Sequence, residues 1–128
     1  MDQLADMFVK IKNASRAGHE TALVAYSQIK FDVAKILEAS GFVAQVTRRG
    51  KKTRRFIELR FDAENAAPKI EGLERISRVS KRIYAGWREL KFYQRGRGTI
   101  IVSTPAGVLA HNDAIKQKVG GELLGRVW

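Results

Sequence analysis

Cysteine is absent from the sequence, and proline occurs only twice. The lack of cysteine excludes disulfides and thiolate metal sites and is typical of proteins from a reducing compartment. No apolar run approaches the roughly 18 residues that suggest a membrane-spanning helix. The amino terminus places Asp2 and Asp6 in an amphipathic pattern, whereas a signal peptide has a basic stretch followed by an apolar one. We therefore expect a soluble, cytoplasmic protein with no membrane partner.

Histidine and clustered acidic residues are also scarce, which argues against catalysis. His19 and His111 have no second histidine at ligand spacing, so we expect both at the surface rather than as metal ligands or bases. Ser103 lacks the flanking glycines of a nucleophile elbow. The glycines at 96–98 precede an expected strand, whereas a phosphate loop leaves a strand to enter a helix. We predict that the chain is not an enzyme and has no cofactor or metal.

Positive charge is present in excess. The 128 residues include 24 lysines and arginines against 13 aspartates and glutamates, which gives a net charge of +11 and a pI near 10.4. With 45% hydrophobic residues, this charge belongs to a folded protein and not to a disordered tail. A folded protein of this charge is expected to bind a polyanion.

Apolar spacing in the first half predicts a helix, a strand at 21–26, a second helix and a hairpin. The opening helix ends before Gly18, and Ser27 caps the second helix. The hairpin is expected to run from Phe42 to Phe61 around a tip that includes Gly50. The apolar faces of the two helices are predicted to lie in the core: Leu4, Met7, Phe8, Ile11, Ile29, Val33, Ile36 and Leu37.

Residues 62–68 hold three alanines, an asparagine and a proline, and are the best candidate for a linker between two lobes. We predict an amino-terminal α/β lobe over 1–64 and a carboxy-terminal, β-rich lobe over 65–128. Acidic residues are scarcer in the second lobe, which makes it the expected binding lobe. The expected fold class is α+β with two small lobes.

The second lobe is expected to be mostly β with one short helix. The pattern predicts a strand at 69–76 and a closing strand at 121–128. Between them lie a hairpin at 99–110 and a short helix that Asn112 or Asp113 would cap.

A basic run lies at the tip of the first predicted hairpin. Six of the eight residues from Arg48 to Arg55 are lysine or arginine. Close like charges repel unless counterions or a polyanion neutralise them. We expect Arg49, Lys51 and Lys52 to contact phosphates; a solvated turn is the alternative.

The stretch 99–108 is a β-branched strand followed by a turn. Pro105 and Gly107 fit a type I turn, which would hold the hydroxyls of Ser103 and Thr104 at an exposed, rigid edge. Hydroxyls at such an edge can bond to the sugar hydroxyls and base edges of RNA. The alternative is a plain hairpin with no binding role.

Further candidates for RNA contact are spread over the second lobe: Arg78, Lys81, Arg82, Tyr84, Gly107, Gly120, Gly121 and Glu122. The basic residues would neutralise phosphates, and the glycines would let the backbone approach a ribose closely. Tyr84 is either a stacking ring or a core aromatic. Glu122 either accepts from a base amino group or forms an ordinary ion pair within the sheet.

The chain resembles the small-subunit ribosomal protein family called S-eight over essentially its whole length. Residues 2–7 with 11–14 are similar to the family's first helix, and residues 37–43 to its second helix running into a strand. The more specific segments, in the family's order and spacing, are Ser77-Arg78, Arg82-Ile83-Tyr84, Ile101-Val102-Ser103-Thr104, Gly107-Val108 and Gly120-Gly121-Glu122. Each segment alone is weakly specific, and the ordered set is strongly so.

The resemblance implies a two-lobe α+β protein that binds the central domain of 16S-type rRNA directly and helps to assemble the platform of the small subunit. It implies that the second lobe supplies most of the contacts, and the candidates carried over by position are Ser103, Thr104, Gly107 and Glu122, with Tyr84 and Lys30 in addition. Family members can also bind their own operon's messenger RNA. The implied protein neighbours are small-subunit proteins of the S-five and S-twelve types, and the implied location is the ribosome.

Three positions depart from the family's pattern. Pro105 stands third in the Ser-Thr-Ser segment, so the hydroxyl and the amide hydrogen of that residue are missing. Val79 replaces a common proline, and the strand beyond Arg78 is expected to continue rather than bend. Ala110 replaces the usual threonine before the last helix, which leaves Asn112 as the expected cap.

Two alternatives to a structural rRNA-binding protein remain open. A basic RNA-processing or RNA-modifying enzyme would turn over RNA in the presence of a divalent metal. A nonspecific RNA-binding assembly factor would keep its protein partners at salt concentrations that abolish RNA binding.

Overall fold

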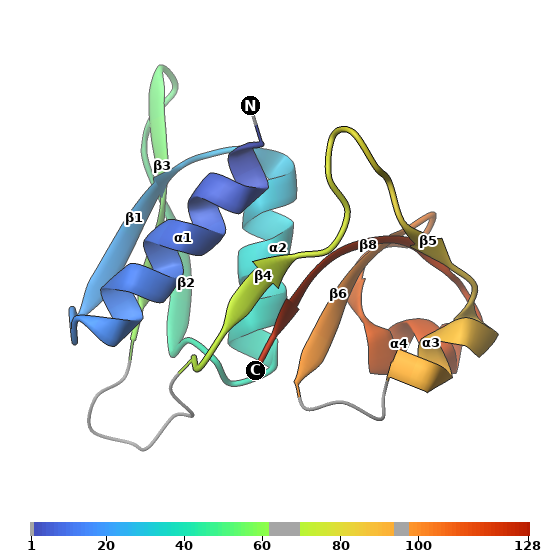
Figure 1. Ribbon diagram of the computed structural model, residues 1–128. Helices are drawn as coiled ribbons and strands as arrows, with labels where there is room; N and C mark the ends of the chain where they lie inside the picture. Colours follow the sequence, from blue (N-terminus) through green and yellow to red (C-terminus); the bar gives the residue numbers. More distant parts are fainter. Residues whose placement is uncertain (1, 62–69, 94–97) are drawn as a thin grey trace. The chain divides into compact units, whose positions relative to one another are not determined.

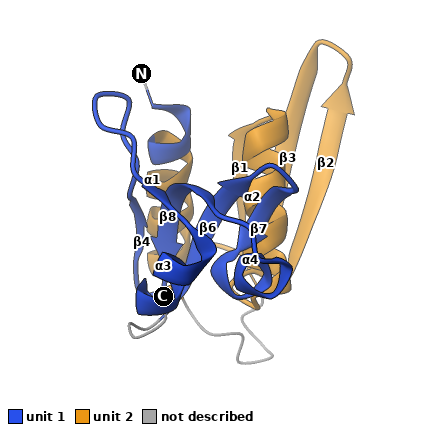
Figure 2. Ribbon diagram, turned by 90° about the vertical axis from the view of Figure 1, so that its right-hand side faces the viewer, with its two compact units in different colours: residues 1–5, 71–128 blue, residues 6–70 orange. Residues whose placement is uncertain are grey.

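The computed structural model describes residues 2–61, 70–93 and 98–128. The chain forms two compact units, one of residues 6–70 and one of residues 1–5 together with 71–128 (Figure 2). Helices and antiparallel strands occur in both units, which confirms the predicted α+β class.

The predicted linker at 62–68, and with it the predicted boundary between residues 64 and 65, lies outside the described residues. In the parts of the chain that the structure describes, no helix is both long enough and apolar enough to cross a membrane.

The unit of residues 6–70 is a three-stranded antiparallel sheet with two helices on one face (Figure 2). The strand order is β1-β3-β2, so β3 is central. The elements are α1 (Gln3–Arg16), β1 (Thr21–Ala25), α2 (Gln28–Ala39), β2 (Gln45–Lys51) and β3 (Arg54–Arg60) (Figure 1).

The two helices bury most of the predicted apolar positions. The predicted face of α1 is buried throughout, and Ser27 caps α2 by accepting a hydrogen bond from the Lys30 amide. The prediction for Ile29 is wrong, because this side chain is 40% exposed. The buried stripe of α2 instead runs through Lys30, Val33, Ala34 and Leu37, which follow the i, i+3, i+4, i+7 spacing.

The hairpin is confirmed, but its turn is shorter than predicted. β2 continues to Lys51 and β3 begins at Arg54, so only Lys52 and Thr53 remain between the strands. Gly50 lies within β2, paired with Arg55. Most of the basic run is therefore displayed on two paired strands rather than on a loose tip.

The unit of residues 1–5 and 71–128 contains a five-stranded antiparallel sheet in the order β4-β8-β6-β7, with β5 also paired to β8 (blue in Figure 2). Its elements are β4 (Leu73–Arg75), β5 (Tyr84–Ala85), α3 (Trp87–Tyr93), β6 (Thr99–Thr104), β7 (Gly107–Ala110), α4 (His111–Gln117) and β8 (Gly121–Val127). The closing strand and the second hairpin are as predicted. The strand predicted at 69–76 is reduced to β4, and α3 is a helix that the sequence analysis did not predict.

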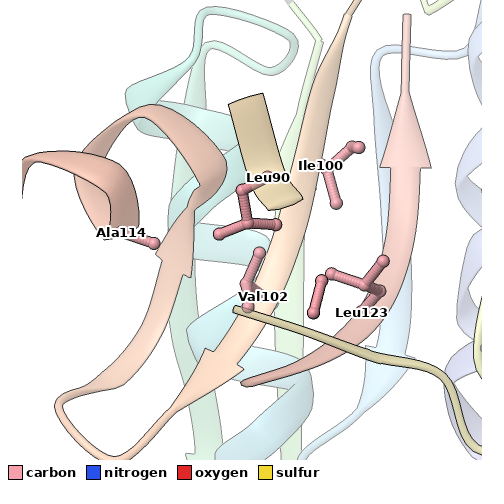
Figure 3. Packing of buried hydrophobic residues seen from close by; sticks show 6 residues of the cluster. Leu90, Ile100, Val102, Ala114 and Leu123 are labelled. Carbon is pink, nitrogen blue, oxygen red and sulfur yellow. The ribbon is translucent and has the colours of Figure 1, made fainter. Parts of the chain in front are cut away.

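The core of this unit lies between one face of the sheet and the two short helices. Leu90 from α3 and Ala114 from α4 meet Val102 of β6 and Leu123 of β8 (Figure 3). All four side chains are apolar and completely buried, and those of Leu90, Val102 and Leu123 are large. Burial of each large side chain stabilises the fold by about 1.5–3 kcal/mol.

The end of β7 runs directly into α4, and this changes two predictions. The N-cap of α4 is Ala110, which makes no side-chain hydrogen bond to the helix, and Asn112 and Asp113 lie inside the first turn. His111 is only 3% exposed, so its predicted surface position is wrong. Its Nδ1 accepts a hydrogen bond from the Ile100 amide at 3.0 Å, which ties α4 to the start of β6.

Protonation of His111 is expected to destabilise the chain at mildly acidic pH. Burial lowers the pKa of His111, against a smaller opposing effect of the Asp113 carboxylate. The pKa of His111 is lower in the folded chain than in the unfolded chain. The stability that neutral His111 contributes is therefore fully present above about pH 6.5, and it is lost as the pH falls towards the folded-state pKa. The free energy of unfolding, measured by urea titration, should therefore fall between about pH 7 and pH 5.

The matched control is the exposed His19. We expect His111→Gln to flatten this pH dependence and His19→Gln to leave it unchanged. A His111→Gln chain that loses stability as steeply as the natural one would show that another group is responsible.

Candidate nucleic-acid interface

Three of the predicted contact residues form a row across the second sheet. Tyr84 of β5 pairs with Glu122 of β8, which pairs with Ser103 of β6, which pairs with Val108 of β7. Directly opposed residues of antiparallel strands point to the same face, and neighbours along a strand point to opposite faces. We call these four residues the outer row.

The outer row lies on the side of the sheet away from the core. Val102 and Leu123, which flank it in sequence, pair with each other and are buried in the core shown in Figure 3. Tyr84 is 66% exposed. The alternative of a core aromatic is therefore wrong for Tyr84, and its ring is accessible for stacking.

Glu122 forms an ion pair with Arg82, which is the alternative that the sequence left open beside recognition of a base. Its Oε2 accepts from Arg82 Nη1 at 2.9 Å, and the Arg82 side chain remains 49% exposed. The ion pair places the Arg82 guanidinium near Tyr84, at one end of the outer row. The hydrogen bond to Glu122 raises the pKa of Arg82, which remains permanently positively charged.

A tight turn precedes this pair and displays two further cations. The Arg78 amide donates to the Lys81 carbonyl at 2.9 Å, and the Lys81 amide donates back at 3.0 Å. The chain reverses at Val79, so the prediction that the strand continues beyond Arg78 is wrong. Ser77 fixes the base of the turn, because its buried hydroxyl accepts from the Ile83 amide at 2.8 Å.

Ser77 is a positioning residue that was not among the predicted contact residues. In the sequence it stands out only through the Ser77-Arg78 segment that resembles the family. A serine followed by a turn carries no local signal for this role, because its partner Ile83 comes six residues later.

One of the two hydroxyls predicted to contact RNA, that of Thr104, instead forms hydrogen bonds within the turn between β6 and β7. The Thr104 hydroxyl donates to the Gly107 carbonyl at 2.7 Å and accepts from the Ala106 amide at 3.1 Å. Thr104 is 9% exposed, so the prediction that both hydroxyls lie at an exposed edge is wrong for this residue. Ser103 faces outward, and Gly107 has a φ of 113°, a conformation that favours glycine.

Gly120 and Gly121 are closed in by neighbouring backbone. A Cβ at Gly121 would collide with the carbonyl of Ser103, and one at Gly120 would collide with the carbonyl of Ala85. The structural need for these glycines is therefore the close approach of β8 to β6 and to the chain after β5. An approach of ribose to the same backbone stays a prediction.

The remaining candidates belong to the other unit. Arg49, Lys51 and Lys52 are exposed on the β2–β3 hairpin, where Arg49 also pairs with Glu58 at 2.9 Å. Lys30 is different, because it is 8% exposed and its ammonium donates to the Ala25 carbonyl at 3.1 Å. The Lys30 ammonium therefore serves a structural contact within its own unit, and a role of Lys30 in RNA contact stays a prediction.

The fold and its exposed basic surfaces define a class of protein: a small, basic α+β protein suited to binding nucleic acid. Among the described residues, no group of histidines and carboxylates could hold a metal ion. A family model described as Ribosomal protein S8 matches residues 2–128, and the chain belongs to this family. This confirms the resemblance seen in the sequence and places the chain among ribosomal proteins rather than enzymes.

Relatives in several bacteria are similar over their whole length. The chain is 42% identical to the small ribosomal subunit protein uS8 of Treponema pallidum, over 99% of this chain and 97% of the relative. It is 38% identical to the protein of that name from Prochlorococcus marinus and 36% identical to that from Trichormus variabilis, with the same coverage.

The close approach at Gly121 predicts a stability effect. We expect Gly121→Ala to lower the free energy of unfolding by about 1–3 kcal/mol, because the added methyl group must push β6 and β8 apart. The matched control is Gly86→Ala, whose added Cβ would meet only the Glu89 carboxylate, at 3.8 Å. Urea titration should show a change within about 0.5 kcal/mol for this control. Equal effects in the two variants would contradict the close-packing role of Gly121.

Proposed function

We propose that the chain is a structural, non-enzymatic constituent of the small ribosomal subunit that binds 16S-type rRNA in its central domain. Its family and the names of its relatives support the assignment to this subunit. The single structural observation that supports direct RNA binding is the outer row, where an exposed aromatic ring, a serine hydroxyl and the carboxylate that pairs with Arg82 share one sheet face.

The proposed mode of binding is recognition of a folded RNA shape. Regular RNA helices offer a shallow minor groove of hydroxyls, and irregular loops expose bases that an aromatic ring can stack on. Ser103 would bond to a sugar or base edge, and Tyr84 would stack or donate its phenol hydrogen. The Arg82–Glu122 pair would present both a donor and an acceptor to the RNA.

Phosphates on either side of this contact would be neutralised by Arg78 and Lys81, which are exposed at the turn before β5. On the other unit, Arg49, Lys51 and Lys52 would contact phosphates without regard to sequence. This division assigns specific recognition to the unit of residues 1–5 and 71–128 and general affinity to the unit of residues 6–70.

The same site would serve assembly and regulation. Binding to the central domain would help the platform of the subunit to form, and an RNA of the same shape in the chain's own operon messenger would compete for the outer row. Neighbouring proteins of the S-five and S-twelve types are the proposed protein contacts, and the proposed location is the assembled ribosome.

Two variants are expected to separate specific from general binding. Ser103→Ala removes an outward hydroxyl and should weaken binding to a central-domain helix about three- to tenfold, with little effect on a scrambled duplex of equal length. Lys51→Ala combined with Lys52→Ala should weaken binding to both RNAs and reduce the salt slope by about one for each lysine. Filter binding or fluorescence anisotropy over a salt series measures both effects.

Thr104 provides the structural control. Thr104→Ala should lower stability as well as binding, because its hydroxyl holds the turn, whereas Thr104→Ser should keep both. If Ser103→Ala weakens the helix and the scrambled duplex equally, the outer row is not the specific site.

A further inference from the structure

A hollow lies where β1 ends and the β2–β3 hairpin continues past it. Ala25 is the last residue of β1, paired with Phe56, and the Tyr26 amide donates to the Arg55 carbonyl at 3.0 Å. The chain then turns into α2, whereas β3 and β2 extend further (Figure 1). The hollow at this step has a volume of about 800 Å³, within the range of small-ligand sites.

The charge of the hollow is of one sign. Its lining includes Lys52, Arg54 and Arg55, and no carboxylate. All three basic residues are exposed. An anionic ligand would be attracted here, and a phosphate would meet several donors at once.

Two aromatic residues also line the hollow, and they differ in accessibility. The Tyr26 ring lies 5.5 Å from the Arg48 guanidinium and 5.9 Å from that of Arg55, and its hydroxyl donates to Gln28 Oε1 at 2.9 Å. Tyr26 is thus held in place among cations. Phe56 is 42% exposed and lies directly opposite Arg49 of β2, on the same face of the sheet as Arg54. Arg55 points to the other face, where it lies beside Tyr26.

An exposed ring beside cations fits one chemical class better than others. A nucleotide has a planar base that stacks on an aromatic side chain and a phosphate that binds basic side chains. Bases of a regular duplex are stacked on each other and cannot enter a hollow, whereas an unpaired nucleotide can be splayed out into one. An acidic protein segment would satisfy the cations but would leave the Phe56 ring without a planar partner.

We propose that this hollow binds an unpaired nucleotide of RNA, with its base stacked on Phe56 and its phosphate held by Lys52 and Arg54. The proposal rests on the proposed function in that the ligand is RNA. It adds a second contact, on the unit of residues 6–70, that recognises single-stranded RNA through base stacking rather than through phosphates alone.

The test uses the full chain and an unstructured RNA of seven nucleotides that carries one fluorescent adenine analogue. We expect Phe56→Leu, which keeps an apolar side chain but removes the ring, to weaken binding about fivefold or more. Phe56→Tyr should bind like the natural chain, because the stacking ring is retained. Phe92→Leu, the same change at an exposed aromatic of α3 outside both proposed contacts, should leave the affinity for this RNA within about twofold.

Three results would overturn the proposal. Phe56→Leu could bind the RNA as tightly as the natural chain; a duplex with the same number of phosphates could show the same dependence on residue 56; or a peptide of eight glutamates could displace the RNA at equal concentration. The proposed function fails by a different result, namely loss of specific helix binding at the outer row. Phe56-dependent binding of the short RNA would then still stand.

Discussion

Strand β8 is the element on which the unit of residues 1–5 and 71–128 depends, because β4, β5 and β6 all pair with it. Gly120, just before the strand, and Gly121, its first residue, let neighbouring backbone approach more closely than a side chain would allow. That close approach sets the register in which Tyr84 and Ser103 both lie opposite Glu122. The same register buries Val102 and Leu123 on the other face, so the core and the candidate RNA surface are fixed together.

The two units display their charged residues differently. In the unit of residues 1–5 and 71–128, Arg82 is already paired with the Glu122 carboxylate, so it is oriented before any ligand arrives. In the unit of residues 6–70, the exposed cations of β2 and β3 stand close together on paired strands, where Glu58 is the carboxylate that pairs with Arg49 and Arg60. An ion pair in a fixed orientation favours selectivity among ligands. A dense row of cations favours affinity for any polyanion, and this affinity falls as the salt concentration rises.

Much of the fold follows from local patterns, and the exceptions depend on contacts between distant segments. The apolar face of α1, the Ser27 cap and the strand before Pro105 have strong periodic or turn signals, and all three are present. Because successive side chains of a strand point to opposite faces, the sequence could have predicted that Ser103 and Thr104 do not share an exposed face. Burial of His111 could not be predicted, because its partner Ile100 lies eleven residues away across a hairpin. Burial of Lys30 likewise depends on the Ala25 carbonyl, to which α2 brings its ammonium.

The most direct test of specific recognition compares two RNAs with the natural chain at physiological salt. One is a small-subunit central-domain helix with its irregular internal loop, and the other is a regular duplex of equal length. Recognition through the outer row predicts that the first RNA binds at least about a thousandfold more tightly, by analogy with specific protein–DNA complexes. Equal affinities with equal salt slopes would contradict it and would leave the chain as a nonspecific binder of polyanions.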